Sequence, residues 1–306
     1  MRCNRLGGSS LEVSEIGLGC MSLPADEAVF ARIVHEACDR GVNFFDTADL
    51  YGQGENERLL GLALRDRRDR VLIATKVGHR FTPGVPGFTW NPTGAYVLRA
   101  VEDCLRRLRT DCIDLCQLHG GTLEDPFDEL TAAMEALMEQ GKIRAYGISS
   151  IRPNVIRRYA AHGRIASVMM QYSLLDRRPE ESVFALLQER GIGVIARGPV
   201  ANGLLADGYA GRLERLPESG YLGYSREELA DLLPRLAALA GGGRPFAQLA
   251  LRFALSAPPV ATAVPGASRE EQLQANAGAA AHPPLSPGEL SSLRALTRAN
   301  RYESHR

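Results

Sequence analysis

The sequence predicts a (β/α)8 TIM barrel, an α/β fold in which each of eight parallel strands is followed by a helix. Short apolar, β-branched segments alternate with longer amphipathic segments along nearly the whole chain, which indicates repeated βαβ units. Eight units in 306 residues are about 38 residues each, which suits a barrel of roughly 250 residues with additions. The alternative is a doubly wound sheet, whose first turn needs three glycines, and the segment Ile16-Gly-Leu-Gly-Cys-Met lacks the third.

Eight strands and several helices can be placed along the chain. The predicted strands lie at residues 16–19, 43–46, 71–75, 113–119, 145–149, 167–171, 193–196 and 260–264. The predicted helices include residues 26–40, 94–109, 126–140, 179–190 and 245–256. Asp26, Thr93 and Asp125 are typical helix N-caps, and Gly41 and Gly141 are typical of the position at which a helix ends.

Four segments extend the barrel. They are an N-terminal hairpin, two long loop insertions and a closing C-terminal helix, at residues 4–13, 78–91, 203–243 and 286–302. The charged run at residues 65–70 is interpreted as a solvated helix end. Because no linker or change of composition divides the chain, we expect residues 1–306 to form a single domain.

The composition is that of a globular protein with balanced charge. The 36 lysines and arginines equal the 36 acidic residues, so the basic excess that nucleic-acid binding needs is missing. No apolar run reaches the roughly 18 residues of a membrane span, and Met1-Arg-Cys-Asn-Arg is no signal peptide. Six cysteines are too few for a disulfide framework at this length, which predicts reduced thiols and a cytoplasmic protein. We expect a small-molecule substrate as partner, and nothing indicates a membrane or protein partner.

Polar residues end three neighbouring predicted strands, at the rim where barrel enzymes carry their catalytic groups. Asp46 ends the second strand and Tyr51 lies in the turn that follows. Lys76 follows the third strand and His119 ends the fourth. Only two of the 36 basic residues are lysines, which favours a role for Lys76 that arginine cannot fill. Each residue alone is explained by a helix cap, packing or a surface position, but together they predict a site.

These side chains suit proton transfer to a carbonyl oxygen. A tyrosine is a poor acid at neutral pH unless a neighbouring cation favours the phenolate, and Lys76, held by Asp46, supplies one. We expect Tyr51 to act as general acid and His119 to donate a hydrogen bond to the same oxygen. A metal-dependent barrel hydrolase or isomerase is a weaker alternative, because only His119 of six histidines ends a predicted strand. Trp90 is either local packing or a wall of the substrate pocket.

The segment Gly41-Val-Asn-Phe-Phe-Asp-Thr-Ala-Asp-Leu-Tyr-Gly52 resembles the first diagnostic motif of the aldo-keto reductases, and the resemblance covers nearly the whole chain. It implies that Asp46, Tyr51, Lys76 and His119 form the family's catalytic tetrad. It also implies that NADPH binds in an extended pose across the top of the barrel, which accounts for the missing glycine fingerprint. The implied activity is NADPH-dependent reduction of aldehydes and ketones to alcohols by hydride transfer. The alternative is an NADPH-binding redox sensor or regulatory protein of the same fold with little turnover.

The resemblance further implies which residues contact the nicotinamide. Gly19, Cys20 and Met21 correspond to the loop after the first strand, on the nicotinamide side of the cofactor. Ser149 and Ser150 correspond to the carboxamide-binding segment, whose second position is usually asparagine in the family. These five residues are the expected contacts at that end of the cofactor.

The next two segments depart from the family's pattern in one residue each. Met169 replaces the glutamine usual in the family, and Gln171, on the same face of the strand, is a candidate replacement. Arg197 stands where many members of the family have an aromatic side chain that stacks on the nicotinamide. The planar guanidinium group of an arginine can stack on a ring in the same way. The pyrophosphate loop is implied for the residues that follow, with Gly198, Pro199 and Gly203.

The last segment that the resemblance implies, from Gly266 to Asn276, binds the adenosine phosphate. Ser268 is predicted to cap a helix whose N-terminus favours a phosphate, and Arg269 is predicted to pair with the ribose 2′-phosphate. Gln272 and Asn276 lie on one helical face, where they reach the adenine. Gly266 replaces the lysine frequent in the family at this motif.

Overall fold

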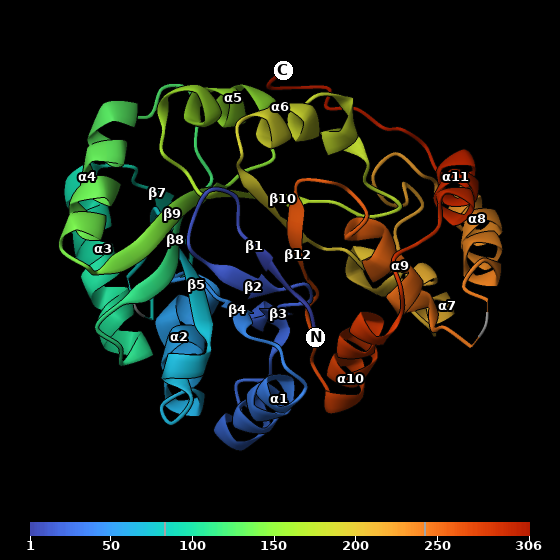
Figure 1. Cartoon of the computed structure of the whole chain (residues 1–306), viewed down its shortest axis with the longest axis horizontal. Coiled ribbons are helices and arrows are strands. Elements are labelled where there is room, and N and C mark those ends of the chain that lie inside the picture. The colour runs from blue at the N-terminus through green and yellow to red at the C-terminus, as the bar shows by residue number, and fades with distance from the viewer. Residues whose placement is uncertain (83, 242) are drawn as a thin grey trace.

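The computed structural model describes residues 1–82, 84–241 and 243–306 (Figure 1). Pro83, in the predicted 78–91 loop, and Gly242, in the predicted 203–243 insertion, lie outside the described residues. Strands form the centre of the molecule and helices surround them (Figure 1). In the described part of the chain, no helix is both long enough and apolar enough to span a bilayer.

The central sheet confirms the predicted (β/α)8 barrel. Within the described residues it contains eight parallel strands, each hydrogen-bonded to the next along the chain. The strands are β3 (Leu18–Gly19), β4 (Phe44–Asp46), β5 (Leu72–Val77), β8 (Ile113–His119), β9 (Ile143–Ser149), β10 (Ser167–Gln171), β11 (Gly193–Arg197) and β12 (Val260–Val264). A separate antiparallel pair, β6 (His79–Arg80) and β7 (Thr89–Trp90), lies in the predicted 78–91 loop.

The first strand is shorter than predicted, and residues in it and before it pair across the seam of the barrel. Ile16 and Gly19 form isolated parallel bridges with Ala263 and Gly266. The Gly17 amide donates to the Ala263 carbonyl at 2.9 Å. These bonds join the β3 side of the sheet to β12, so that the sheet closes almost completely.

The amino-terminal end of the barrel is filled by apolar side chains. Phe44 and Leu115 point into the barrel and are fully buried, because alternate residues of a strand face opposite sides. The N-terminal hairpin, β1 (Cys3–Arg5) and β2 (Glu12–Ser14), adds Leu6 to the same cluster. The hairpin therefore covers this end of the barrel interior.

Helices cover the outside of the barrel (Figure 1). Those around the sheet are α1 (Glu27–Asp39), α2 (Glu55–Ala63), α3 (Gly94–Leu108), α4 (Phe127–Glu139), α5 (Pro153–His162), α6 (Val183–Glu189), α9 (Phe246–Ala254) and α10 (Glu270–Gly278). The additions carry α7 (Ala210–Leu213), α8 (Arg226–Ala238) and α11 (Pro287–Leu296). Asp26 and Thr93 cap α1 and α3 as predicted, each accepting a hydrogen bond from an amide of the first turn.

Asp125 does not cap α4, contrary to the prediction. Pro126 occupies the N-cap position. The Asp125 carboxylate instead accepts hydrogen bonds from the Thr122 amide at 2.6 Å and from the Trp90 indole at 2.9 Å. A tertiary contact with a distant loop therefore takes the side chain away from the helix end.

The closing helix is shorter than the predicted range of 286–302. It ends at Leu296, and Thr297 has extended backbone angles. The buried Arg177 guanidinium donates to the Thr297 carbonyl at 3.1 Å and to its hydroxyl at 3.2 Å. The Thr297 carbonyl oxygen thus has a hydrogen-bond donor at the helix end, and no further helical turn is needed to supply one.

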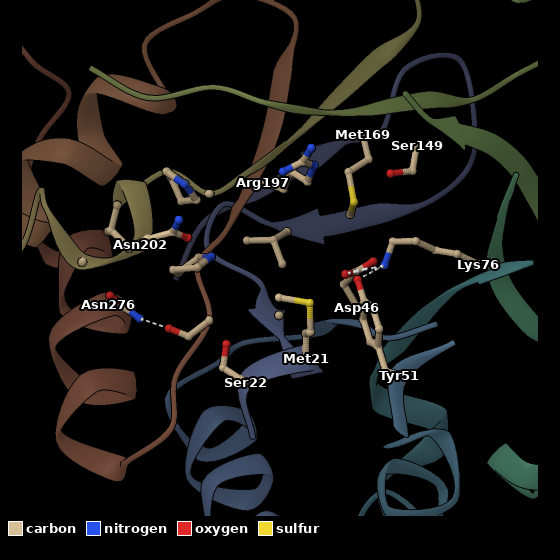
Figure 2. Close-up of a pocket in the computed structure, with 18 of the residues that line it drawn as sticks. Met21, Ser22, Asp46, Tyr51, Lys76, Ser149, Met169, Arg197, Asn202 and Asn276 are labelled. Atoms are coloured by element: carbon tan, nitrogen blue, oxygen red, sulfur yellow. Dashed lines mark hydrogen bonds and ion pairs between the residues drawn. The ribbon is translucent and has the colours of Figure 1, made fainter. Parts of the chain in front are cut away.

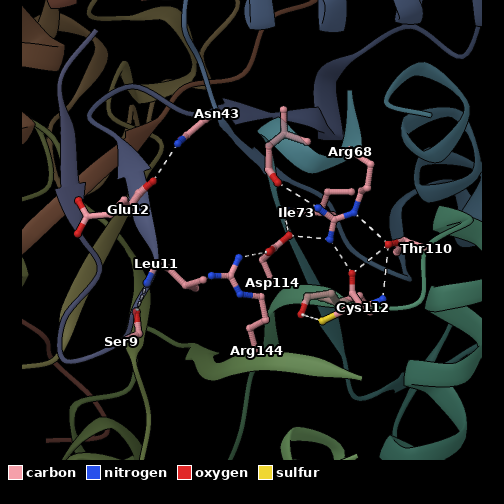
Figure 3. A network of polar contacts seen from close by, with 12 residues as sticks. Ser9, Leu11, Glu12, Asn43, Arg68, Ile73, Thr110, Cys112, Asp114 and Arg144 are labelled. Atoms are coloured by element: carbon pink, nitrogen blue, oxygen red, sulfur yellow. Dashed lines mark hydrogen bonds and ion pairs between the residues drawn. The ribbon is translucent and has the colours of Figure 1, made fainter. Parts of the chain in front are cut away.

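The charged run at residues 65–70 is not solvated throughout, contrary to the prediction. Arg68 is half-buried, and its guanidinium donates to the Asp114 carboxylate at 2.7 Å and to the Cys112 carbonyl at 2.6 Å (Figure 3). Arg144 donates to the other oxygen of Asp114, also at 2.7 Å. The two arginines neutralise a carboxylate that is almost fully buried on β8.

Candidate active site

A cavity of about 1220 Å³ opens where the carboxyl ends of the strands meet. It extends from Tyr51 and Lys76 at one end to Asn202 and Asn276 at the other (Figure 2). The predicted site residues that line it are Gly19, Met21, Asp46, Tyr51, Lys76, Trp90, His119, Ser149, Ser150, Arg197, Gly198, Pro199, Gly203, Gly266, Ser268, Arg269, Gln272 and Asn276. The structure thus gathers most of the predicted residues around one elongated cavity.

Lys76 lies at the centre of a hydrogen-bonded group. Its Nζ donates to Oδ2 of Asp46 at 2.7 Å and to the Thr47 carbonyl at 2.7 Å. The same Nζ lies 3.3 Å from the hydroxyl oxygen of Tyr51. Lys76 is only 1% exposed, so its charge acts on these neighbours with little screening by water. The predicted amine therefore contacts both the predicted carboxylate and the predicted phenol.

Burial and charge act in opposite directions on the pKa values of this group. Burial raises the pKa of Tyr51, and the Lys76 ammonium opposes that shift without cancelling it. The net shift is upward, opposite to the tuning expected from the sequence, because desolvation of the phenolate outweighs the ammonium. Burial also disfavours the charged form of Lys76, but Asp46 and Tyr51 outweigh burial and raise its pKa. Lys76 is therefore an ammonium and Tyr51 a protonated phenol.

His119 is neutral at physiological pH. Burial lowers its pKa to about 3, assisted by the charges of Lys76 and Arg197. Its ring meets the Tyr51 ring edge-on at 6.1 Å between centroids and the His79 ring at 5.2 Å. A neutral imidazole forms hydrogen bonds but is a poor source of a proton.

Trp90 packs locally and also lines the cavity. Its Nε1 donates to Asp125, and its ring lies 5.1 Å from the His79 ring. These contacts fix the indole, which forms a rigid wall beside His119.

A tight turn places Tyr51 over Lys76. Tyr51 begins a 3₁₀ turn, Tyr51–Gly54, in which the last three residues have positive φ angles. At Gly54, with φ of 93°, a Cβ would lie 2.6 Å from Cδ of Arg107. Gln53 ties the turn to the 78–91 loop, donating to the Val85 carbonyl at 2.8 Å. Gly52 and Gly54 therefore serve the geometry of the turn that carries the phenol.

Asp49, in the same turn, is a buried carboxyl group behind the cavity wall. It is 1% exposed, and neither of its oxygens has a hydrogen-bond partner among the described atoms. Burial raises its pKa to about 8, and the nearby Glu57 carboxylate adds to the shift while Arg107 opposes it. Asp49 is therefore protonated in the folded protein at neutral pH.

Replacing Asp49 with asparagine is expected to stabilise the protein at pH 8 and not at pH 4. The folded pKa lies above that of the unfolded chain, so the cost of keeping Asp49 protonated grows from about pH 4 to about pH 8 and is constant above that. The neutral amide removes this cost, and we expect a gain of about 1–3 kcal/mol at pH 8. Thermal unfolding at both pH values measures it, with the exposed Asp69→Asn as control. A gain of equal size at pH 4 would contradict the explanation.

The far end of the cavity is formed by the loop after β12 and the first turn of α10. The Gln272 side-chain oxygen accepts hydrogen bonds from the amide and hydroxyl of Ser268 at 2.9 and 3.0 Å. The Asn276 side-chain amide donates to the Gly266 carbonyl at 3.2 Å (Figure 2). These contacts stiffen the loop and bring its backbone to the cavity.

The prediction that Ser268 caps this helix is wrong. α10 begins at Glu270 with Arg269 in the N-cap position, because the Ser268 hydroxyl is bound to Gln272. Arg269 is exposed, and its side chain forms no hydrogen bond or ion pair with another described residue. Its guanidinium is therefore available to an anion at the start of the helix.

Two predicted cofactor contacts do not line the cavity. The Cys20 thiol is fully buried and points to the Leu18 carbonyl, 3.7 Å away. The Gln171 amide is turned away, donating to the Tyr221 hydroxyl at 2.8 Å and accepting from Arg197 at 3.2 Å. In each case the side chain contacts a neighbouring residue instead of the cavity.

Other wall residues were missed. They are Ser22, Leu50, His79, Gly120, Gly121, Thr122, Ile151, Arg152, Val200, Asn202, Ala206, Asp207, Arg212, Ala247, Val264, Pro265, Glu271 and Ala275. Met169 also lines the cavity, at the position where the family usually carries a glutamine. His79 was within reach of sequence reasoning, because it follows Lys76 by three residues, just beyond the end of the strand that carries Lys76. Asp207 and Arg212 gave no such signal, since they lie in the long insertion.

Comparisons with known proteins agree with this arrangement. The model of the Aldo/keto reductase family matches residues 15–298. The chain is similar to the uncharacterized oxidoreductase YqkF of Bacillus subtilis (strain 168), with 46% identity over 307 residues and 100% of both chains covered. It is also similar to the probable aldo-keto reductase 1 of Glycine max, with 33% identity over 90% of this chain and 84% of that protein.

Two solved structures extend the comparison. The holo form of aldo-keto reductase AKR11C1 from Bacillus halodurans is 49% identical, with a TM-score of 0.92 over 100% of this chain and 99% of that chain. The glycerol dehydrogenase AKR11B4 from Gluconobacter oxydans is 25% identical, with a TM-score of 0.85 over 99% of this chain and 98% of that chain. With sequence, fold and family model in agreement, the chain belongs to the aldo/keto reductase family and is an oxidoreductase of that family.

Proposed function

We propose that this protein reduces aldehydes and ketones to alcohols with NADPH as the hydride donor. The observation that carries the proposal is the contact between the Tyr51 hydroxyl and the buried Lys76 ammonium, 3.3 Å apart at one end of the cavity. The proposed compartment is the cytoplasm, where the chain's six cysteines stay reduced.

The cavity wall suits an extended dinucleotide. A polar wall at one end, a glycine-containing loop in the middle and the free Arg269 at the other end match a nicotinamide, a pyrophosphate and a ribose phosphate. Gly198 and Gly203 have positive φ angles in the middle loop, where absent side chains let a ligand approach the backbone. The residues assigned to the nicotinamide are Gly19, Met21, Ser149, Ser150 and Arg197. Those assigned to the pyrophosphate are Gly198, Pro199 and Gly203, and those assigned to the adenosine phosphate are Gly266, Ser268, Arg269, Gln272 and Asn276.

When bound, the cofactor supplies a hydride to the carbonyl carbon. Tyr51 donates its proton to the carbonyl oxygen as general acid. Lys76 remains charged beside the phenol and stabilises the phenolate left behind, while Asp46 holds the ammonium in place. His119, kept neutral by burial, donates a hydrogen bond that orients the same oxygen. The raised pKa of Tyr51 keeps the proton on the phenol until negative charge develops on the substrate.

A spectrophotometric screen tests the proposed reaction. NADPH oxidation is followed with aldehydes, ketones and sugar carbonyls, and glycerol with NADP⁺ is included for the reverse reaction. We expect turnover with at least one aldehyde. Tight NADPH binding without turnover on any substrate would contradict the proposal and favour the regulatory alternative.

Replacing Arg269 with alanine is expected to weaken NADPH binding about 10- to 100-fold and to leave NADH binding nearly unchanged. A free guanidinium at the start of α10 pairs with the 2′-phosphate, which NADH lacks, through charge-assisted hydrogen bonds. Fluorescence titration with both nucleotides measures the difference. Arg235→Ala is the matched control, because Arg235 is also exposed but pairs with Asp231 on α8, away from the cavity. Equal losses for the two nucleotides would show that Arg269 does not bind the 2′-phosphate.

A further inference from the structure

Arg197 is held at the cavity by a neighbouring amide. It is the last residue of β11, and Figure 2 shows its guanidinium across the cavity from Asp46 and Tyr51. Its Nη1 donates to the side-chain oxygen of Gln171, the last residue of the adjacent β10, at 3.2 Å. Because the guanidinium is a rigid plane, a bond to one of its nitrogens restrains the whole group.

The other end of that amide is bound by the 203–243 insertion. The Gln171 nitrogen donates to the Tyr221 hydroxyl oxygen at 2.8 Å. A guanidinium only donates hydrogen bonds, so the amide oxygen must face Arg197 and the nitrogen is left for Tyr221. Neither Gln171 nor Tyr221 is among the residues that line the cavity. Their contacts therefore act on Arg197 rather than on a ligand.

A tight turn fixes the position of Tyr221. Its backbone pairs with that of Tyr224 through hydrogen bonds of 2.8 and 3.1 Å. At Gly220, with φ of 73°, a Cβ would lie 1.8 Å from the Tyr224 carbonyl oxygen, so the turn requires glycine there. The buried Tyr224 accepts a hydrogen bond from the Arg298 amide at 2.7 Å. One tyrosine of the turn thus anchors it to the C-terminal segment, and the other reaches Gln171.

The place of Arg197 also matters to the proton-transfer group. Burial is the main influence on the pKa values of Tyr51 and His119, raising the first and lowering the second. The Arg197 charge adds a downward contribution to both. A displaced guanidinium would therefore change the electrostatics of the catalytic end as well as its shape.

We infer that Gln171 and Tyr221 are positioning residues that hold the Arg197 guanidinium at the nicotinamide end of the cavity, with the 203–243 insertion as its support. The inference rests on the proposed function, because that function assigns Arg197 to the cofactor. It gives the insertion a role in cofactor binding that needs no contact between Tyr221 and the cofactor.

The first test needs no nucleotide. Phenylglyoxal modifies accessible guanidinium groups, and peptide mass spectrometry follows the rate at Arg197 in the full-length protein. We expect about three- to tenfold faster modification in Gln171→Leu and Tyr221→Phe, as the loss of one hydrogen bond allows. Tyr209→Phe is the matched control, since it removes a hydroxyl from the same insertion, but Tyr209 packs against Phe246 and takes no part in the contacts among Arg197, Gln171 and Tyr221. Unchanged rates in both test variants would overturn the inference.

The second test is a double-mutant cycle on NADPH affinity measured by fluorescence titration. Tyr221→Phe is expected to weaken binding about three- to tenfold in the parent, and by less than twofold when Arg197 is already alanine. Equal losses in the two backgrounds would show that Tyr221 acts elsewhere and would overturn the inference. If the parent binds no NADPH, the proposed function fails, and the modification rates still decide whether Gln171 and Tyr221 hold Arg197.

Discussion

Replacing Tyr51 with phenylalanine is expected to slow hydride transfer by about 10²–10⁴-fold, the usual contribution of general acid catalysis. The substitution removes only the hydroxyl 3.3 Å from Lys76 and leaves the ring that packs against His119. NADPH affinity and thermal stability are expected to stay close to those of the parent. Single-turnover reduction of a reactive aldehyde, followed at the nicotinamide absorbance, measures the rate of the chemical step.

Tyr159→Phe provides the control for Tyr51→Phe. Tyr159 is a tyrosine buried in the apolar core, on α5, and it does not line the cavity. Its variant should transfer hydride at the parental rate. A parental rate in Tyr51→Phe itself would mean that Tyr51 is not the acid. His119 would then be the next candidate, although a pKa near 3 makes it a poor proton source.

Replacing Lys76 with arginine is expected to lower the rate about 10²-fold or more, although the positive charge is kept. The ammonium is enclosed by Asp46, the Thr47 carbonyl and Tyr51, and is 1% exposed. A planar guanidinium cannot occupy that space without moving the phenol, and a displacement of about 1 Å in a catalytic group costs roughly 10²-fold. The same single-turnover assay measures this variant, with circular dichroism to confirm folding.

The other lysine supplies the matched control. Lys142 is half-buried and pairs with Glu102 outside the cavity, so Lys142→Arg should keep full activity. The two variants carry the same chemical change and differ only in place. Near-normal turnover in Lys76→Arg would show that positive charge alone suffices beside Tyr51.

The strands and the contact between Asp46 and Lys76 were predictable because their signals are local. The apolar runs at residues 113–119, 167–171 and 260–264 match β8, β10 and β12 to the residue. Asp46 and Lys76 could be paired from the sequence alone, because parallel strands bring their carboxyl ends to one rim. Their 2.7 Å contact agrees with that reasoning. This part of the prediction rested on the order of the strands and on the rule that the carboxyl ends of barrel strands lie at one rim.

The failures concern side chains whose partners are remote in sequence. Gln171 was predicted on the same face of its strand as Met169, as a replacement cofactor contact, but Arg197 and Tyr221, 26 and 50 residues away, bind the two ends of its amide. Ser268 was predicted as a cap without knowledge that Gln272 would bind its hydroxyl. The upward pKa shift of Tyr51 depends on how deeply the turn is buried, which no spacing in the sequence reveals.

The scarcity of lysine has a practical consequence for handling this protein. Lys76 is enclosed in the core, whereas Lys142 precedes β9, at the end of the barrel opposite the cavity. Apart from the α-amino group, amine-reactive reagents therefore meet a single accessible side chain, because the other 34 basic residues are arginines. Coupling to an activated ester surface through Lys142 would immobilise the enzyme with its cavity facing the solution. A dye attached there would report on tumbling or association without blocking substrate entry.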